Sequence, residues 1–162
     1  MEVYLSINGY KKEQSCIVGH ISSLGYYEVK VDAIEAFKIR EKGLRHNGGL
    51  HMIEEIKDYL NEFEISDLPL YFYELASNHS SGQSIGRYEG ETTCLMFEPS
   101  KLLYPISKIV ENTDNILSLW DDEYPQLLQE TIEKKEPEFL EAFRVLIEEA
   151  IEQDAMIGIS FS

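Results

Sequence analysis

Basic residues are scarce in this sequence. It contains 14 Lys and Arg residues against 30 Asp and Glu residues among 162, which gives a formal net charge of −16 at pH 7. Proteins that bind nucleic acid or anionic membranes by the usual electrostatic route need cations that neutralise phosphate groups. The charge balance therefore argues against direct binding to either surface and favours a basic protein as the partner.

Cysteines are also rare, and long apolar runs are missing. Cys16 and Cys94 each lie in a short apolar stretch without a C-x-x-C motif or a nearby histidine cluster. The chain begins Met-Glu-Val-Tyr, which lacks the basic and then apolar segments of a secretory signal. No apolar run approaches the ~20 residues of a membrane-spanning helix. These absences predict a cytosolic protein with two reduced thiols.

The length and the apolar content predict one folded domain over residues 1–162. A chain of this length with 43% hydrophobic and 11% aromatic residues can bury one ordinary core, and a second independent core is not expected. The same composition distinguishes the chain from a disordered acidic tail.

Alternating apolar residues predict a mostly antiparallel sheet. In residues 2–8, Val3, Leu5 and Ile7 alternate with polar neighbours, and Asn8-Gly9 follows them as a hairpin signal. The other predicted strands are Cys16–Ile21, Tyr26–Val31, Leu68–Leu75, Thr92–Phe97 and Met156–Phe161. A polar loop, Ser77–Gly90, is expected before the strand Thr92–Phe97.

Helical signals separate these strands. Asp32 and Glu35 resemble the capping box of a short helix that ends at Gly43, and residues 45–49 are expected to form a flexible link. Apolar residues recur at steps of three and four over residues 50–63, which predicts an amphipathic helix. A basic cluster, Lys38, Arg40, Lys42 and Arg45, fits the C-terminal end of the first helix, where cations favour the helix dipole.

The C-terminal third is predicted to be helical and acidic. Helical turns are expected around residues 116–120, and two helices are expected to start near Pro125 and Pro137, because proline favours the first turn of a helix. Pro99 and Pro105 are expected to interrupt regular structure. The predicted fold class is therefore α+β: a single domain with a mostly antiparallel sheet and about five helices.

The motif Gly82–Gly86 matches the G-x-S-x-G pattern of serine hydrolases around Ser84. A nucleophile elbow needs a strand before the motif, a helix after it and a histidine further along the chain. Polar residues precede this motif, no helical stripe follows it, and the last histidine, His79, lies upstream. The motif is therefore interpreted as part of a loop. A local pair of His79 with Ser80 or Ser84 is left as an alternative.

Metal and cofactor motifs are not found either. His46 and His51 are five residues apart across two glycines, unlike the i, i+4 spacing of H-E-x-x-H. Gly48-Gly49 and Gly82–Gly86 match neither the Walker A pattern nor G-x-G-x-x-G after a strand. We therefore predict no metal, no cofactor and no catalytic residue.

Negative charge is concentrated near the C-terminus. Residues 111–154 hold 14 acidic and three basic residues, a formal charge of −11, whereas the first 110 residues hold 16 acidic and 11 basic residues, a charge of −5. A solvated helix face with acids near helix N-termini is the simpler account of any single residue. Concentrating the charge costs self-repulsion that interspersed lysines would avoid, so we interpret the segment as a binding surface.

The predicted partner-binding residues are eight acids and two aromatic anchors. In the last helix, glutamates occupy the side opposite an apolar stripe. Three consecutive acids precede Pro125, beside the aromatic candidates. The full set is Trp120, Asp121, Asp122, Glu123, Tyr124, Glu138, Glu141, Glu148, Glu149 and Glu152.

In its size, expected compartment and acidic segment Trp120–Asp154, the chain resembles bacterial immunity proteins that neutralise nuclease-type toxins, including those of contact-dependent growth inhibition. This resemblance implies a non-enzymatic inhibitor that blocks the active site of a cognate toxin. One alternative is a DNA mimic that inhibits a restriction or anti-phage defence enzyme. Another is a small enzyme that uses the loop Ser77–Tyr88.

Overall fold

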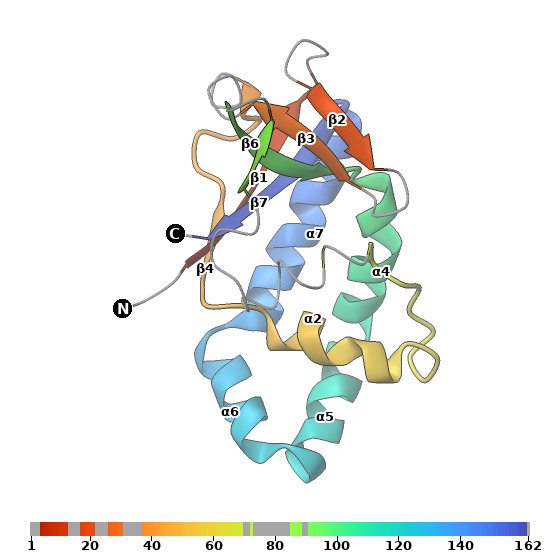
Figure 1. Cartoon of the computed structure of the whole chain (residues 1–162). Helices are drawn as coiled ribbons and strands as arrows, with labels where there is room; N and C mark the ends of the chain where they lie inside the picture. Colours follow the sequence, from red (N-terminus) through yellow and green to blue (C-terminus); the bar gives the residue numbers. More distant parts are fainter. Residues whose placement is uncertain are drawn as a thin grey trace.

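Seven strands form one antiparallel sheet in the computed structural model, which describes residues 4–12, 17–21, 26–30, 37–69, 72, 85–88 and 91–161 (Figure 1). The strands are β1 (Tyr4–Lys11), β2 (Ile17–Ile21), β3 (Tyr26–Lys30), β4 (Leu44–Asn47), β5 (Ile85–Tyr88), β6 (Glu91–Phe97) and β7 (Ala155–Phe161). Their order is β2-β3-β6-β7-β1-β4, and β5 pairs with β6 beside the end of β7. β4 is thus an edge strand.

Helices form a layer on one side of the sheet and extend beyond it. They are α2 (His51–Glu55), the 3₁₀ helix η3 (Ile56–Tyr59), α4 (Ser100–Glu111), α5 (Thr113–Glu123), α6 (Pro125–Glu133) and α7 (Glu136–Glu152). α7 contacts β1, β4 and β7 and runs beside α4, while α5 and α6 form the end of the molecule opposite β2 and β3 (Figure 1). The predicted α+β class is confirmed, and so are the antiparallel sheet and the helical C-terminal third.

Four of the predicted strands are confirmed to within one residue at each end, as β2, β3, β6 and β7. The helices predicted from Pro125 and Pro137 are also confirmed, because proline lies in the first turn of both α6 and α7. These segments carry strong local signals, so their secondary structure could be predicted from the sequence.

The hairpin predicted at Asn8-Gly9 is wrong. β1 continues through both residues, and they pair with Gly158 and Ile157 of β7. The Asn8 side chain accepts a hydrogen bond from the Gly9 N–H at 2.8 Å and donates one to the Arg40 carbonyl at 2.8 Å. Because β7 pairs with β1 from Leu5 to Lys11, the local turn propensity is overridden.

Two strands occupy segments predicted to be loops. β4 covers most of the expected flexible link 45–49 and pairs with β1, and β5 lies inside the expected loop Ser77–Gly90 and pairs with β6. Both are four residues long, so their stability comes from the partner strand rather than from their own sequences. The strand predicted over Leu68–Leu75 is not formed at residues 68–69 or at Phe72, and the rest of it lies outside the described residues.

The helix predicted over residues 32–43 is not formed in residues 38–43; Phe37 is in a 3₁₀ turn, and residues 32–36 lie outside the described ranges. Lys38 instead makes an isolated antiparallel bridge with Tyr10, and the chain then bends as far as Gly43. A Cβ atom at Gly43 would lie 2.5 Å from the Ile7 carbonyl oxygen, so glycine allows the chain to approach β1 closely. The basic cluster therefore does not end a helix.

Two further helix predictions also need correction. Residues 50–63 form the short α2 and η3 and then turns, rather than one amphipathic helix. Pro105 lies inside α4 instead of interrupting it. Its ring is buried, and packing of the ring against the core offsets the helix hydrogen bond that the missing N–H removes.

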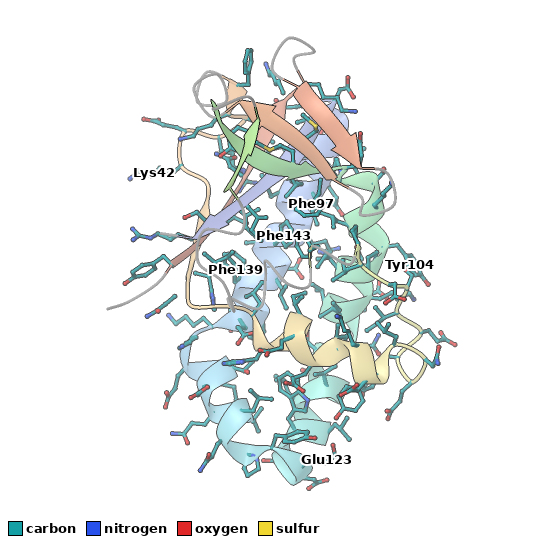
Figure 2. All side chains as sticks on the ribbon, viewed as in Figure 1. Lys42, Phe97, Tyr104, Glu123, Phe139 and Phe143 are labelled. Atoms are coloured by element: carbon teal, nitrogen blue, oxygen red, sulfur yellow. The ribbon has the colours of Figure 1, made fainter. Side chains whose placement is uncertain are left out.

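The apolar face of α7 supplies the centre of the core. Its fully or nearly buried side chains are Phe139, Leu140, Phe143, Leu146, Ile147 and Ala150. Phe143 stacks on Phe72 with 5.9 Å between ring centroids, and Phe72 meets Phe97 of β6 edge to face at 5.4 Å. Figure 2 shows Phe97, Phe143 and Phe139 along the junction between the sheet and α7. Burial of this face thus positions α7 against the sheet.

We expect Phe143→Ala to lower the free energy of unfolding by about 3–5 kcal/mol, because it removes a fully buried ring and its aromatic contact. Urea denaturation followed by circular dichroism measures the change. The matched control is Val145→Ala on the same helix, where the side chain is 44% exposed and the expected change is within about 0.5 kcal/mol. Equal losses in the two variants would contradict the assigned orientation of α7.

Candidate functional site

The outer side of α7 carries a row of exposed carboxylates. Glu138, Glu141, Glu148 and Glu152 are exposed and recur at steps of three, seven and four residues, so they lie on one side of the helix. We refer to these four residues as the α7 acidic stripe. Val145, which is 44% exposed, lies in the gap between Glu141 and Glu148. The stripe therefore combines negative charge with an accessible apolar side chain at its middle.

One cation lies beside the stripe. The Arg144 guanidinium pairs with Glu141 and lies 3.9 Å from the Glu148 carboxylate. The hydrogen bond to Glu141 raises the pKa of Arg144, so the arginine stays charged. Four glutamates and this single arginine leave a formal charge of −3 on this side of α7. Exposed ion pairs of this kind contribute little to stability.

Glu149 is not part of the exposed surface that we predicted for it. Its carboxylate accepts hydrogen bonds from Nη2 and Nε of Arg40, at 2.7 and 3.0 Å, and both side chains are about 70% buried. The two residues are 109 positions apart in the sequence. The Arg40–Glu149 pair therefore links the bend at residues 38–43 to α7. Because this carboxylate already binds Arg40, the prediction that Glu149 contacts a partner is corrected.

Three exposed acids lie at the end of α5. Asp121, Asp122 and Glu123 form its last turn, and Figure 2 shows Glu123 at the far helical end of the molecule. Acids at the C-terminal end of a helix oppose its dipole, although acids just before α6 favour the dipole of that helix. The helix dipoles thus give no net reason for three acids here. The Glu123 carboxylate also accepts a hydrogen bond from the Tyr59 hydroxyl at 3.2 Å.

The two predicted aromatic anchors have different environments. Trp120 is completely buried in the core and cannot reach a partner, so its prediction as an anchor is wrong. Tyr124 is 46% exposed between α5 and α6. It lines a hollow of about 400 Å³ with Glu123 and Leu127. A partner side chain can therefore contact Tyr124 but not Trp120.

Large apolar side chains are exposed on the helices. Within the part of the chain whose side chains are described, all five of them lie on α4, α6, α7 or the α5–α6 junction. They are Tyr104, Tyr124, Ile132, Val145 and Ile151. The helical layer thus exposes both apolar and acidic side chains.

One acid of the C-terminal segment faces inward. Glu136 is fully buried at the start of α7, where its Oε1 accepts a hydrogen bond from the Met52 N–H at 3.0 Å. Its Oε2 has no hydrogen-bond partner, and burial raises the pKa of Glu136 to about 7. The burial of Glu136 could have been predicted from the sequence, because position 136 is in register with the buried positions 140 and 143 of the apolar stripe.

His46 joins β4 to the turn before α7. Its ring is buried, with Nδ1 3.0 Å from the Gly48 carbonyl oxygen and Nε2 3.0 Å from the Lys134 carbonyl oxygen. Burial lowers the pKa of His46, although both carbonyls favour the protonated ring. His51 lies 3.2 Å from Glu130 of α6. Within the described ranges, no three His, Cys, Asp or Glu side chains form a group that could hold a metal ion.

The G-x-S-x-G motif has a strand where an elbow needs a helix. β5 begins at Ile85, immediately after Ser84, and pairs with β6. A nucleophile elbow requires a helix at that point. His79, Ser80 and Ser84 lie outside the described residues, so the local pair remains a prediction.

Comparison with known proteins gives no relative: no family model, curated protein or solved structure matches the chain. In the described segments, no helix is both long and apolar enough to cross a membrane. The functional argument therefore depends on the surfaces of this chain itself, and the resemblance to immunity proteins remains a prediction.

We expect the free energy of unfolding to fall as the pH rises, because the buried Glu136 carboxyl ionises. The pKa of Glu136 is about 7 in the folded state, against an ordinary value of 4.5. Its contribution to the free energy of unfolding is therefore fully present below pH 4.5 and is lost as the pH rises through 7. Relative to Glu136→Gln, the wild-type protein should lose up to about 3 kcal/mol of unfolding free energy between these pH values.

Urea denaturation at pH 5, 6, 7 and 8 measures this difference between the two proteins. Glu138→Gln on the exposed side of the same helix is the matched control and should change with pH as the wild type does. Parallel pH profiles for the wild type and Glu136→Gln would show that the buried carboxyl does not cause the effect.

Proposed function

We propose that the chain is a non-enzymatic inhibitor that binds a basic protein through the α7 acidic stripe, and that this protein is a nuclease-type toxin domain. The observation that carries the proposal is the position of the stripe. Its four carboxylates are all exposed opposite the buried face of a single long helix, with Val145 among them. A rigid helix can present such a row to a partner without a cost in backbone ordering.

The acids at the C-terminal end of α7 do not stabilise the helix, although Glu138 in the first turn favours the helix dipole. The last turn of α7 holds no basic residue, and Glu149 and Glu152 lie there, where carboxylates oppose the helix dipole. Like charges that are concentrated in one segment also repel one another. A surface that served solubility alone would avoid both costs by interspersing lysine. Binding to a basic surface offsets them, because opposite charges attract across the interface.

Affinity needs more than charge, and the chain offers apolar contacts beside the acids. Val145 and Ile151 are exposed on α7, and Tyr124 is exposed next to the acids that end α5. Desolvated apolar and aromatic side chains supply most of the binding energy at protein interfaces, while surrounding charges steer the encounter. The combination supports a specific protein complex.

A nuclease-type toxin domain suits this surface because its active-site groove must attract phosphate groups. A groove of that kind is lined by cations, so a rigid row of carboxylates can enter it and exclude the nucleic acid. The resemblance of this small acidic chain to toxin-immunity proteins supports the same partner. Inhibition would then need no chemistry from the inhibitor.

The spacing of the carboxylates favours this function over mimicry of DNA. At a rise of about 1.5 Å per residue, the successive glutamates of the stripe are separated along α7 by about 4.5, 10.5 and 6 Å. Phosphates of one DNA strand follow at a regular interval of about 3.4 Å along the axis. An uneven row with Val145 in its gap suits one matched partner better than any DNA-binding protein. The small enzyme based on the loop Ser77–Tyr88 has no comparable support.

We expect reversal of three stripe charges, in the triple variant E138K/E148K/E152K, to slow association with the partner by about tenfold and to flatten its salt dependence. The partner is first captured on the immobilised protein and identified. Association rates are then measured by surface plasmon resonance at several salt concentrations. The proposal also requires that the partner is a basic nuclease and that the wild-type chain inhibits it.

The matched control is D58K/E62K/E64K, which makes the same change of net charge at three exposed acids away from α7. Its association rate should stay within about twofold to threefold of the wild type. Equal slowing in both variants would attribute the effect to net charge and overturn the assigned stripe. Competition by duplex DNA at several unrelated DNA-binding proteins would support the DNA mimic instead.

A further inference from the structure

A second surface feature carries the opposite charge. A hollow of about 450 Å³ lies at the β4 edge of the sheet, between β1 and the bend at residues 38–43. Three cations line it: Lys38, Lys42 and Arg45. We refer to it as the β1–β4 hollow. Figure 2 shows Lys42 beside the sheet and Glu123 at the opposite, helical end of the molecule.

The wall of this hollow is held in place by several independent contacts. The Ile39 N–H donates to the Gly9 carbonyl at 2.9 Å, and the buried Asn8 side chain donates to the Arg40 carbonyl at 2.8 Å. The Arg40 side chain is in turn paired with Glu149 of α7. The bend at residues 38–43 is thus fastened both to β1 and to the helical layer, so the hollow is formed before any ligand binds.

The charge of the hollow contrasts with that of the chain. Among the described residues that line it, none carries a carboxylate, although acids outnumber bases by 30 to 14 in the sequence. The nearby Glu149 carboxylate is already paired with Arg40. Ser6 and Tyr10 add polar side chains to the lining, whereas the buried Asn8 amide is bonded to Gly9 and Arg40. Local potentials at distances below about 8 Å are dominated by the nearest charges, so the hollow attracts anions despite the net charge.

Arg45 is oriented for such contacts. Its guanidinium lies over the Tyr4 ring, with 3.9 Å between the central carbon and the ring centroid. Stacking uses the face of the guanidinium and leaves its N–H donors in the plane, where they can bind the oxygens of a phosphate or carboxylate. An arginine that is held in one orientation loses less entropy when it binds an anion.

The dimensions and the lining together indicate the class of ligand. A volume of about 450 Å³ is that of a small-molecule site rather than of a single ion. The half-buried Leu44 and Tyr10 add apolar surface for the body of a ligand. Among the lining cations, Lys42 and Arg45 are exposed, and an arginine fork beside a lysine suits a phosphate group. We propose that the β1–β4 hollow binds a small organic phosphate, with the phosphate toward Lys42 and Arg45.

This site is independent of the partner surface on α7. Phosphate binding at the sheet edge uses none of the residues of the α7 acidic stripe. A failure of one proposal therefore leaves the other intact.

The test is a titration of the ¹⁵N-labelled full chain with phenyl phosphate, followed by ¹H–¹⁵N NMR. We expect saturable shifts at the backbone amides of β4 and residues 38–43, and weaker binding of inorganic phosphate and of benzoate. Lys42→Gln should raise the dissociation constant for phenyl phosphate by about tenfold, because it removes one charged donor at an exposed position.

The control is Lys101→Gln, which removes the same charge from an exposed position on α4 and should leave the dissociation constant within about twofold. Arg45→Gln is a second variant, and thermal unfolding verifies that it still folds after losing its stack on Tyr4. Shifts spread over lysines outside the hollow, or equal affinity in the Lys42 and Lys101 variants, would overturn the site. Benzoate binding as tightly as phenyl phosphate would overturn its assignment to phosphates.

Discussion

The packing of α7 against the sheet and α4 is the contact on which the rest of the structure depends. α7 buries one continuous apolar face, and each large side chain on it contributes about 1.5–3 kcal/mol by leaving water. β1, β4 and β7 all meet this helix, so its position sets the centre of the fold. Because a helix has one orientation that buries this face, the glutamates on the other side must lie in solvent. The core and the acidic surface are two consequences of the same periodicity.

Buried polar groups attach the first turn of α7 to the rest of the molecule. Glu136 accepts a hydrogen bond from the start of α2, and His46 of β4 lies within hydrogen-bond distance of the Lys134 carbonyl just before α7. A buried carboxyl is costly, and one oxygen of Glu136 has no partner. Such groups favour one arrangement over others that bury similar apolar area. They also make the attachment of α7 sensitive to pH near neutrality.

β4 connects the two surfaces of opposite charge. Successive residues of a strand point to opposite faces, so Arg45 faces the Tyr4 ring in solvent while His46 faces the core. Arg40, from the bend before β4, reaches Glu149 on α7. One short segment thus supplies the cations of the β1–β4 hollow and the contacts that hold the acidic helix. A strongly acidic chain can keep a basic site in this way, because charges beyond a Debye length of about 8 Å are screened.

Elements with local signals could be predicted from the sequence: the strands β2, β3, β6 and β7, the helix starts at Pro125 and Pro137, and the exposed side of α7. Contacts between distant segments were needed to establish that Asn8-Gly9 continues a strand, that residues 44–47 form β4 and that Trp120 belongs to the core. The same holds for the pairing of Glu149 with Arg40, 109 residues away. Periodicity and proline report the preferences of neighbouring residues, whereas strand pairing, burial and ion pairing depend on which distant segments share a surface.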